Sequence, residues 1–499
     1  MSHSEVDATT PLLKTTQADE TEVPHGASAR QDDDEWGGTE ARREMEKALV
    51  WKLDKRMSIL VLMYIMNFID RNNAAAARLR GFEEELHLQG TQFASLLSVL
   101  YIGYISMQIP SNMFLHHTGR PSLYLPACMA VWGLLTVAMG FTTNFLGAVT
   151  SRFLLGVVEA SFFPGALFLI SKWYKHSELG FRTALLFSGN LISNAFGSLI
   201  ASAILDSMHG VLGQSAWRWL FHVEGFLTVL VAIWAAVILP DFPETAKPGW
   251  LTEKEIRLAR TRMQEDSDET RQVQTDEYEP VPKGHVAGFM LAMRDPITYI
   301  LTILMTSQIL GQSFNMYFPT LASTLGYNRT ISLLLCAPPF LLSAVSTFLN
   351  SRHSDRTGER FYHVSIPFCI GIIGFVIATQ TMNTGWRYFS LFLMTQAYAG
   401  FAILYGWMSN TFPSPPAKRA VAVAFCNSAS QLGNITGSYL WPIEWGPSYR
   451  NSFLVCIIAT SGSILMCYLL RLRLKTLNKR IIREERERGA RAPGFRYLL

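Results

Sequence analysis

Twelve separate stretches of this chain are apolar over roughly twenty residues each, and this feature limits its possible folds more than any other. A helix of that length crosses the hydrocarbon core of a bilayer, which is about 30 Å thick. Only 16% of the residues are charged, against about 25% in soluble domains. We therefore predict an all-α polytopic membrane protein with spans near residues 57–77, 91–113, 121–141, 146–170, 183–206, 219–240, 297–318, 330–350, 363–382, 387–409, 420–441 and 452–472.

The hydrophilic blocks divide the chain into two sets of six spans. The first fifty residues are acidic and polar, without the pattern of a cleavable signal peptide, and residues 1 to about 40 have the composition of a disordered segment. The predicted units are a disordered cytoplasmic N-terminal tail with a pre-span helix (1–50), an N-terminal six-helix bundle (51–240), a cytoplasmic central loop (241–294), a C-terminal six-helix bundle (295–472) and a cytoplasmic C-terminal tail (473–499).

The central loop contains a predicted helix, and the distribution of basic residues predicts the orientation of the chain in the membrane. Thr252 and Glu255 form a capping-box pattern, which predicts a short helix over residues 251–263. If the N-terminus is cytoplasmic, the short inner loops and flanking ends hold 15 Lys and Arg residues and the outer loops hold 6. The excess of basic residues on one side predicts that both termini are cytoplasmic.

An internal repeat is indicated by two loops. "SNMFLHHTGRP" follows the second span and "NSRHSDRTGER" follows the eighth, so corresponding loops of the two halves share His, Thr, Gly and Arg. Repeated halves are common among membrane transporters.

The first span carries charges that a lipid-facing helix would not have. Asp70 lies 14 residues beyond Arg56, or about 21 Å along a helix, which places Asp70 and Arg71 past the membrane midplane. Tyr64, Asn67 and Arg71 share one polar face. A charge at the centre of a span costs about 3 kcal/mol on insertion scales, so it needs a reason. The alternative is that Asp70 and Arg71 lie in the outer headgroup zone.

The fourth span carries a second charged pair. Arg152 and Glu159 lie two turns apart on one face, with Gly156 between them allowing a neighbouring helix to approach. Arg152 is expected level with Asp70 and Arg71, and Glu159 about 10 Å deeper. An arginine and an acid from each of two helices are therefore predicted to meet in one cavity. The alternative is a structural Arg152–Glu159 bridge along the span.

Two buried arginines suit an anionic substrate, because the planar guanidinium matches a carboxylate and stays charged. Asp70 and Glu159 could change their proton occupancy when substrate claims a neighbouring arginine, which would couple transport to protons. Glu224, beside Arg218 at the start of the sixth span, is interpreted as a headgroup-level ion pair.

Other classes of function find little support in the sequence. The six cysteines fall inside spans without CxxC spacing, and five histidines sit at the inner surface rather than in a cluster within the spans. We therefore expect no enzyme activity, no metal and no cofactor. The basic residues flank spans rather than forming a patch, so nucleic acid is not an expected partner. The expected partners are a small organic anion, protons and the lipid bilayer, and we expect a monomer.

Four strings give the chain a resemblance to a known family. They are "YIMNFIDRNN" in the first span, "RFLLGVVEASFFPGALFLISKWY" in the fourth, "WRWLFHVEGFLTVLVA" with "LPDFPETAKPGWLTEKE" around the sixth, and "SDRTGER" after the eighth. Together they resemble the anion:cation symporter branch of the major facilitator superfamily, and within it fungal allantoate permease-like transporters. The resemblance runs from about residue 50 to 475.

The resemblance implies two six-helix bundles that expose a central site alternately to each side. It implies that Arg71 and Arg152 contact a substrate carboxylate and that Asp70 and Glu159 take part in proton coupling. Tyr64 and Asn67 share the face of Arg71 and are assigned to the same substrate site. By the same resemblance, the polar cavity-lining positions are Asn190 and Asn427.

One loop departs from the family pattern. "HHTGRP" after the second span has no acid, whereas Asp355 and Arg356 keep the acid and the base after the eighth, with Arg360 nearby. A gating charge relay is therefore expected in the second half, at Asp355, Arg356 and Arg360.

The function expected from the sequence is proton-coupled import across the plasma membrane. The substrate would be a small organic anion, a carboxylate such as nicotinate, pantothenate, allantoate or a related vitamin or nitrogen-source acid. Two alternatives remain open: export of a metabolite or toxin with the same fold, and a nutrient sensor that does not transport.

Overall fold

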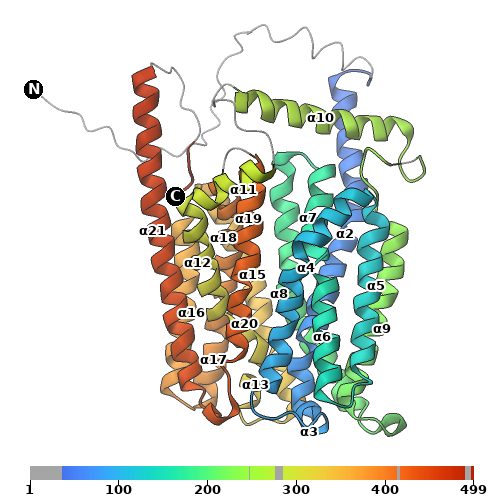
Figure 1. Ribbon diagram of the computed structural model, residues 1–499, viewed down its shortest axis with the longest axis vertical. Coiled ribbons are helices and arrows are strands. Elements are labelled where there is room, and N and C mark those ends of the chain that lie inside the picture. Colours follow the sequence, from blue (N-terminus) through green and yellow to red (C-terminus); the bar gives the residue numbers. More distant parts are fainter. Residues whose placement is uncertain (1–35, 247, 276–284, 413–415, 489–495) are drawn as a thin grey trace, which may run out of the picture.

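The structure is a computed structural model that describes residues 36–246, 248–275, 285–412, 416–488 and 496–499. Within these ranges all regular structure is helical. Figure 1 shows long helices standing side by side, with α10 (Glu253–Thr275) lying across one end and the short α3 (Phe82–Glu85) at the other. We call these the α10 end and the α3 end. The expected disorder at residues 1–40 falls almost wholly outside the described residues.

Ten helical segments of the described chain are long and apolar enough to cross a membrane. Two further crossings run parallel to them: α2 (Thr39–Ala77), and the pair α19 (Pro416–Ser430) and α20 (Leu432–Ser438). They coincide with the first and eleventh predicted spans. The all-α membrane fold predicted from the sequence is confirmed.

The N-terminal half consists of α2 and five further crossings. Its other elements are η1 (Arg78–Arg80), α3, α4 (Gln92–Thr118), α5 (Pro121–Met139), α6 (Phe145–Glu159), α7 (Phe162–Trp173), α8 (His176–Ser207), η2 (Val211–Gly213) and α9 (Ala216–Ile238).

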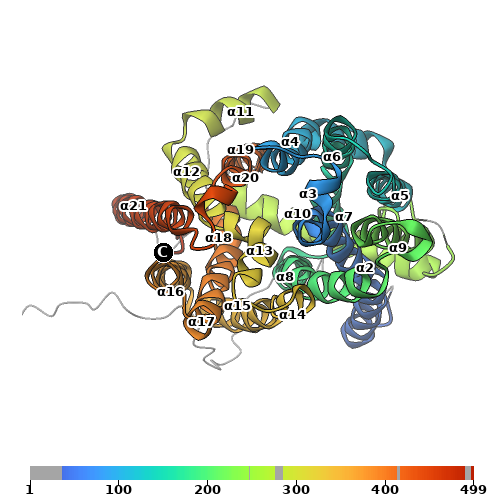
Figure 2. The ribbon, with the colours of Figure 1, turned by 90° about the horizontal axis from the view of Figure 1, so that it is seen from below.

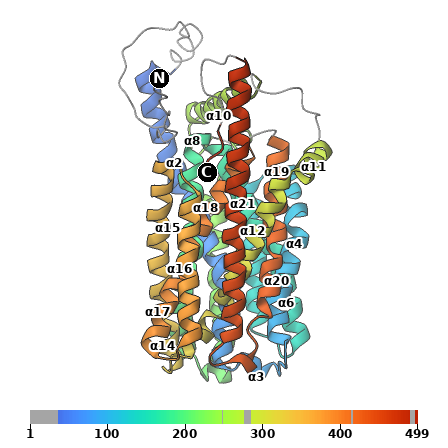
Figure 3. The same ribbon diagram turned by 90° about the vertical axis from the view of Figure 1, so that its left-hand side faces the viewer.

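The C-terminal half begins with α11 at the α10 end and finishes with α21, which Figure 3 shows standing alongside α12 and α16. Its elements are α11 (His285–Arg294), α12 (Pro296–Gly311), η3 (Ser313–Tyr317), α13 (Phe318–Ser323), α14 (Arg329–Leu334), α15 (Ala337–Thr357), α16 (Phe361–Gln380), α17 (Thr384–Thr395), α18 (Ala397–Thr411), α19, α20, η4 (Ile443–Trp445) and α21 (Arg450–Arg488).

Several crossings that the sequence predicts as single spans are interrupted near their middle. The fourth breaks between α6 and α7, directly after Glu159, and Pro164 near the start of α7 has no N–H to continue the helical bonding. The seventh passes through the 3-10 turn η3 before Pro319 opens α13, and a proline also lies at the start of α15. Such breaks free backbone groups at membrane depth, where transporters commonly place their sites.

The two halves form separate groups of helices that meet along α4 and α8 (Figure 2). At the α3 end the hydroxyl of Tyr439 lies 3.1 Å from Ser95 Oγ, and Thr330 Oγ1 donates to Asp206 Oδ1 at 2.9 Å. Nearer the middle, Ser428 Oγ donates to Gln108 Oε1 at 2.6 Å. Apolar contacts join the halves as well: the ring centroids of Phe93 and Tyr317 lie 5.9 Å apart, and one cluster of buried apolar side chains includes residues of both halves.

The two similar loops identified in the sequence end their helices in the same way. Gly119 and Gly358 follow α4 and α15 with φ of 64° and 66°. The N–H of Gly119 donates to Leu115 O at 3.1 Å, and that of Gly358 to Ser354 O at 3.0 Å. Glycine suits this left-handed conformation because it has no Cβ. The shared geometry supports the internal repeat.

The capping box predicted in the central loop is present, and it starts a helix longer than expected. Thr252 N donates to Glu255 Oε2 at 2.9 Å, and Glu255 N donates to Thr252 Oγ1 at 3.3 Å. The resulting α10 continues to Thr275. Ion pairs from Lys52 to Glu255 at 2.6 Å and from Arg262 to Glu178 at 2.5 Å attach it to the N-terminal half.

Glycines bring α4 and α6 into backbone contact. A Cβ added at Gly156 would lie 1.9 Å from Leu100 O, and one added at Gly103 would lie 2.4 Å from Phe153 O. Any side chain at either position would push the helices apart, so the approach predicted at Gly156 is confirmed. Gly156 lies between Arg152 and Glu159, and the close packing therefore sets the position of both charged side chains.

We predict that Gly156→Ala lowers the thermal unfolding temperature, because its methyl group would overlap the backbone of α4. Overpacking of this kind costs about 1–3 kcal/mol. The measurement is thermal unfolding of purified protein followed by tryptophan fluorescence. Gly462→Ala on α21 is the matched control, because no atom lies within 4 Å of the added Cβ. Equal unfolding temperatures for the two variants would contradict the packing described here.

Candidate functional site

The four charged residues of the first and fourth predicted spans lie inside the N-terminal half, largely shielded from the surface. Asp70 is fully buried, and Arg152 and Glu159 are each 1% exposed. The side chain of Arg71 is 10% exposed. Burial within the protein argues against the alternative that Asp70 and Arg71 lie among lipid headgroups.

Arg71 of α2 and Glu159 of α6 form an ion pair between the two helices. Arg71 Nε and Nη2 both donate to Glu159 Oε2, at 2.9 and 2.7 Å. The alternative of an Arg152–Glu159 bridge along a single span is therefore wrong, because the carboxylate bonds across to α2 instead. Glu159 is the last residue of α6, where the helix break leaves its side chain free to reach Arg71.

Arg152 meets α2 at the predicted depth but binds different acceptors. Its Nη2 donates to Asn73 Oδ1 at 2.7 Å, and its Nη1 donates to Arg71 O at 3.0 Å and to Asp70 O at 3.4 Å. Within the described residues no carboxylate lies within 4 Å of this guanidinium. Among the described residues, Arg152 therefore has no direct ionic partner.

Asp70 does not join the cavity of the two arginines, contrary to the prediction that both acids would meet there. Its side chain points toward α9, where Thr228 Oγ1 donates to Asp70 Oδ2 at 2.7 Å. The reason is helical phase: consecutive residues of a helix point about 100° apart, so Asp70 and Arg71 cannot face the same neighbour. The two acids consequently lie on different sides of α2.

Glu224 of α9 was misinterpreted from the sequence. It is 3% exposed and lies within electrostatic reach of Asp70, Arg152 and the Asn73 side chain. Its supposed partner, Arg218, instead donates to Glu85 Oε2 at 3.3 Å and to nearby backbone carbonyls. Glu224 follows Arg218 by six residues, and at about 100° per residue the two side chains lie on different faces of α9. This spacing could have shown from the sequence that they do not pair.

Tyr64 and Asn67 lie on the α10 side of Arg71 along α2, on the same face, as expected from their spacing. Arg71 Nη2 donates to Asn67 Oδ1 at 3.4 Å. Tyr64 stacks on Phe162 and Phe163 of α7, with ring centroids 5.9 and 5.7 Å apart. Asn67 thus touches the ion pair, whereas Tyr64 belongs to an aromatic wall beside it.

A small space opens beside the arginines on the α4 side of α2. It is lined by both Arg71 and Arg152, by Tyr101 of α4 and by Met316 of the C-terminal half. The guanidinium carbon of Arg71 also lies 5.0 Å from the ring centre of Tyr104. Positive charge framed by aromatic faces suits a flat organic anion.

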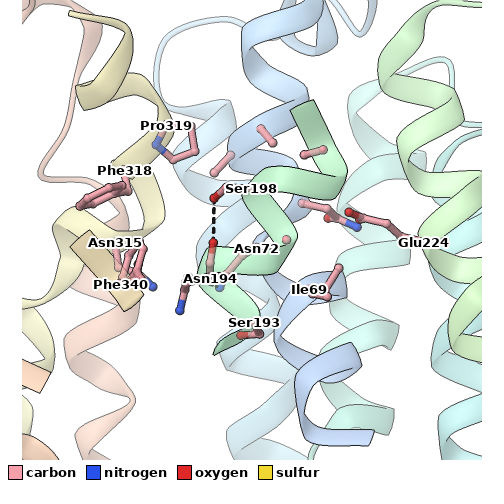
Figure 4. Close-up of a pocket in the computed structure, with 15 residues that line it drawn as sticks. Ile69, Asn72, Ser193, Asn194, Ser198, Glu224, Asn315, Phe318, Pro319 and Phe340 are labelled. Atoms are coloured by element: carbon pink, nitrogen blue, oxygen red, sulfur yellow. Dashed lines mark hydrogen bonds between the residues drawn. The ribbon is translucent and has the colours of Figure 1, made fainter. Parts of the chain in front are cut away.

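A second cavity lies on the α8 side of α2, between the halves. Figure 4 shows Glu224 reaching in from one side and Asn315, Phe318 and Phe340 from the other. Its volume is about 40 Å³, which is room for about three water molecules. Binding an organic acid here would require the halves to separate. We call it the amide cavity, because Asn72, Asn73, Asn194 and Asn315 line it.

Asn190 is linked to the amide cavity rather than to the arginines. Asn194 Nδ2 donates to Asn190 Oδ1 at 3.0 Å, and Asn72 Nδ2 donates to Asn194 Oδ1 at 3.1 Å. This chain of amides ties α8 to α2. Asn190 therefore does not line the cavity itself but is hydrogen-bonded to Asn194, which does.

Asn427 is the predicted site residue from the C-terminal half. Tyr405 OH donates to Asn427 Oδ1 at 2.9 Å, and the Tyr405 ring lies 4.9 Å from Phe187 of α8. Asn427 therefore holds an aromatic ring that bridges the halves. Within the described contacts it does not touch Arg71 or Arg152.

Two of the three charged residues predicted for the gating loop form an ion pair. Arg360 Nη1 lies 2.8 Å from Asp355 Oδ1, whereas Arg356 is exposed. The Arg360 N–H also donates to Leu499 O at 2.6 Å. In the first half, where the loop has no acid, Asp241 after α9 lies beside the start of α5, and its Oδ1 accepts from Ser122 Oγ at 2.5 Å. Each half therefore has a carboxylate at this level, although only one comes from the loop itself.

Known proteins share both the sequence and the fold. The chain is 29% identical over 426 residues to the MFS-type transporter cnsO of Penicillium expansum, covering 83% of this chain and 80% of that protein. It is 28% identical over 416 residues to a putative tartrate transporter of Agrobacterium vitis, covering 82% and 90%. A crystal structure of a D-xylose-proton symporter superposes with a TM-score of 0.63 at 15% identity, covering 84% and 97%.

The family profile described as the Major Facilitator Superfamily matches residues 60–438. This range runs from the first crossing to the end of α20 and includes every charged residue of the site. The similar proteins and the matching fold are those of transporters and not of enzymes. The chain belongs to the major facilitator superfamily of membrane transporters.

Proposed function

We propose that this transporter imports a small organic anion together with protons by alternating access. The substrate would be a carboxylate such as nicotinate, pantothenate, allantoate or a related vitamin or nitrogen-source acid. The observation that carries the proposal is the presence of Arg71 and Arg152 on the wall of one internal space. A guanidinium in a low-dielectric site attracts a carboxylate strongly and does not lose its own charge.

The Arg71–Glu159 ion pair suggests how protons and anion are coupled. A substrate carboxylate that docks on Arg71 competes with Glu159 for the same N–H donors. If Glu159 takes a proton, its carboxyl no longer holds Arg71, and the guanidinium becomes available to substrate. Releasing that proton on the other side of the membrane restores the ion pair and expels the anion.

The similar proteins support parts of this scheme. One relative carries the name of a tartrate transporter, and tartrate is a carboxylate. One solved structure with this fold is a proton symporter for D-xylose. The Asp355–Arg360 pair, the loop glycines and the polar contacts between the halves suit a molecule whose halves rock against each other.

We further propose that the protein is a monomer in the plasma membrane, with both termini and the α10 end on the cytoplasmic side. The basic flanks that motivated this orientation include Lys52, Arg56 and Arg182. Under this orientation the helix interruption after Glu159 lies between the arginines and the cytoplasm. Imported anion would leave past Glu159.

We predict that Arg152→Ala weakens carboxylate binding roughly 10- to 100-fold, because a charge-assisted hydrogen bond contributes about 1.5–3 kcal/mol. Arg152→Lys should recover only part of the lost affinity, since a lysine lacks the two parallel N–H donors of a guanidinium. The measurement is concentration-dependent uptake of labelled nicotinate, pantothenate, allantoate and tartrate. Arg450→Ala, an exposed position at the start of α21, is the control. Unchanged apparent affinity in Arg152→Ala would refute the anion site.

Glu159→Gln is predicted to abolish accumulation driven by a pH gradient while leaving exchange of labelled for unlabelled anion. Glutamine keeps the size of the side chain but cannot carry a proton. Both activities are measured in proteoliposomes with an imposed pH gradient. Exposed Glu444→Gln should behave as wild type. Full proton-driven accumulation in Glu159→Gln would show that the coupling is assigned to the wrong residue. Outward transport by the wild-type protein would favour an exporter.

Arg71 and Glu159 are predicted to act as one energetic unit. Removing one partner of a buried pair costs about 3–5 kcal/mol, because the other charge is left uncompensated. Arg71→Gln combined with Glu159→Gln should therefore cost less than the sum of the two single changes. The free energies come from unfolding titrations with sodium dodecyl sulfate. Strictly additive costs would mean that the contact contributes nothing to stability.

A further inference from the structure

The buried charges of the N-terminal half do not balance. Within the described crossings of this half there are three buried carboxyls, on Asp70, Glu159 and Glu224, and two buried guanidiniums, on Arg71 and Arg152. Only Glu159 has a direct ionic partner among them. If every group were ionised, the region would hold one uncompensated negative charge in a medium where such a charge is costly.

Asp70 and Glu224 lie close enough to act on each other electrostatically. Arg152 stands near both but directs its donors to Asn73 and to backbone oxygens. Two unpaired carboxylates side by side repel, and a proton on one of them removes the repulsion. The geometry therefore contains a place for a proton in addition to the one assigned to Glu159.

Within the described residues, the other charged groups on the elements packed against α9 do not pair with Glu224: Arg78 of η1 has its Nε 3.1 Å from Glu83 Oε1. The charged groups that act on it are Asp70 of α2 and Arg152 of α6. Among the neighbours of α9, α5 has no charged residue. The acids and bases of α8 lie near its ends, at Glu178, Arg182 and Asp206, and Asp206 pairs with Arg80 at 3.3 Å.

Glu224 differs from Asp70 in having access to a cavity. It lines the amide cavity, whereas Asp70 is enclosed by α2, α5 and α9. Its Oε2 has no hydrogen-bond partner within the described residues. The cavity continues past Asn72 and Asn194 to Asn315 of the C-terminal half (Figure 4). Water-sized space lined by amides is a plausible medium for moving a proton.

We propose that Glu224 is a second proton-binding carboxyl of this transporter, reached through the amide cavity. The proton would travel on the α8 side of α2, while the anion binds on the α4 side between Arg71 and Arg152. This proposal rests on the proton-coupled function proposed above and adds a site to it. With Asp70 and Glu224 neutral, the region carries one net positive charge while Glu159 is ionised and two once Glu159 is protonated and has released Arg71, which is the state that binds the anion. When Glu224 loses its proton, one unit of that positive charge is cancelled and the anion is held less strongly.

The first test needs no substrate, because its probe is the proton itself. Infrared difference spectra of the purified wild-type protein between acidic and neutral pH report protonated carboxyl groups through their C=O stretch. Glu224→Gln should remove one such carboxyl signal, and Glu224→Asp should shift that signal without removing it. Glu444→Gln should leave the buried carboxyl signals unchanged. A carboxyl region unaltered in both Glu224 variants would overturn the proposal.

The second test counts protons during transport. Proteoliposomes containing a pH-sensitive dye report proton entry, and labelled anion reports substrate entry, using whichever of nicotinate, pantothenate, allantoate or tartrate the wild type transports. Glu224→Gln should lower the proton-to-anion ratio by one. An unchanged ratio would overturn the role of Glu224. Anion entry without protons in the wild type would overturn the proposed function instead, so the two failures are distinguishable.

If Glu224→Gln cannot be purified as a folded protein, Glu224→Asp together with Asp70→Asn decides the matter. Asp70→Asn should retain the signal that Glu224→Asp shifts, because that signal belongs to Glu224. If instead the carboxyl signal disappears in Asp70→Asn and stays unshifted in Glu224→Asp, the proton belongs to Asp70. That result would overturn the proposal.

Discussion

The contact on which the rest of this structure depends is the ion pair between Arg71 and Glu159, which joins α2 to α6 inside the membrane. Neither charge would be tolerated in its crossing without the other. α6 ends at Glu159, and one turn earlier Gly156 lets α4 approach to backbone contact. The break and the glycine of the fourth crossing therefore lie next to the ion pair and fix the position from which Glu159 reaches Arg71.

The same constraint explains why α2 is unlike a lipid-facing helix. It faces α6 with Arg71 and Asn73, α9 with Asp70, and α8 with Asn72. A helix with polar groups in all these directions cannot face lipid on any of them at this level. It is packed by neighbouring helices instead, and this explains how the first crossing can carry two charged and three amide side chains.

The class of fold and the depth of the charged residues could be predicted from the sequence, because both follow from apolar length and from the rise of a helix per residue. The helix that each charged side chain contacts could not be predicted in this way, because it depends on how the helices pack. Asp70 and Arg71 are adjacent in sequence but face different helices. Glu224 was assigned to Arg218 because the sequence alone does not show which helices pack against α9. The breaks at Pro164 and Pro319 were missed because apolar length alone does not register them.

The two arginines are chemically alike but held in different ways, and this difference bears on mechanism. Arg152 donates to an amide oxygen and to two backbone carbonyls, which are acceptors that no change of pH can remove. Arg71 donates to a carboxylate, an acceptor that a single proton can neutralise. Arg152 is therefore a fixed positive charge at every stage of a cycle, and Arg71 is the one whose availability can vary. A transporter needs both properties: a constant charge that defines which substrates enter, and a variable one that makes their binding depend on protons.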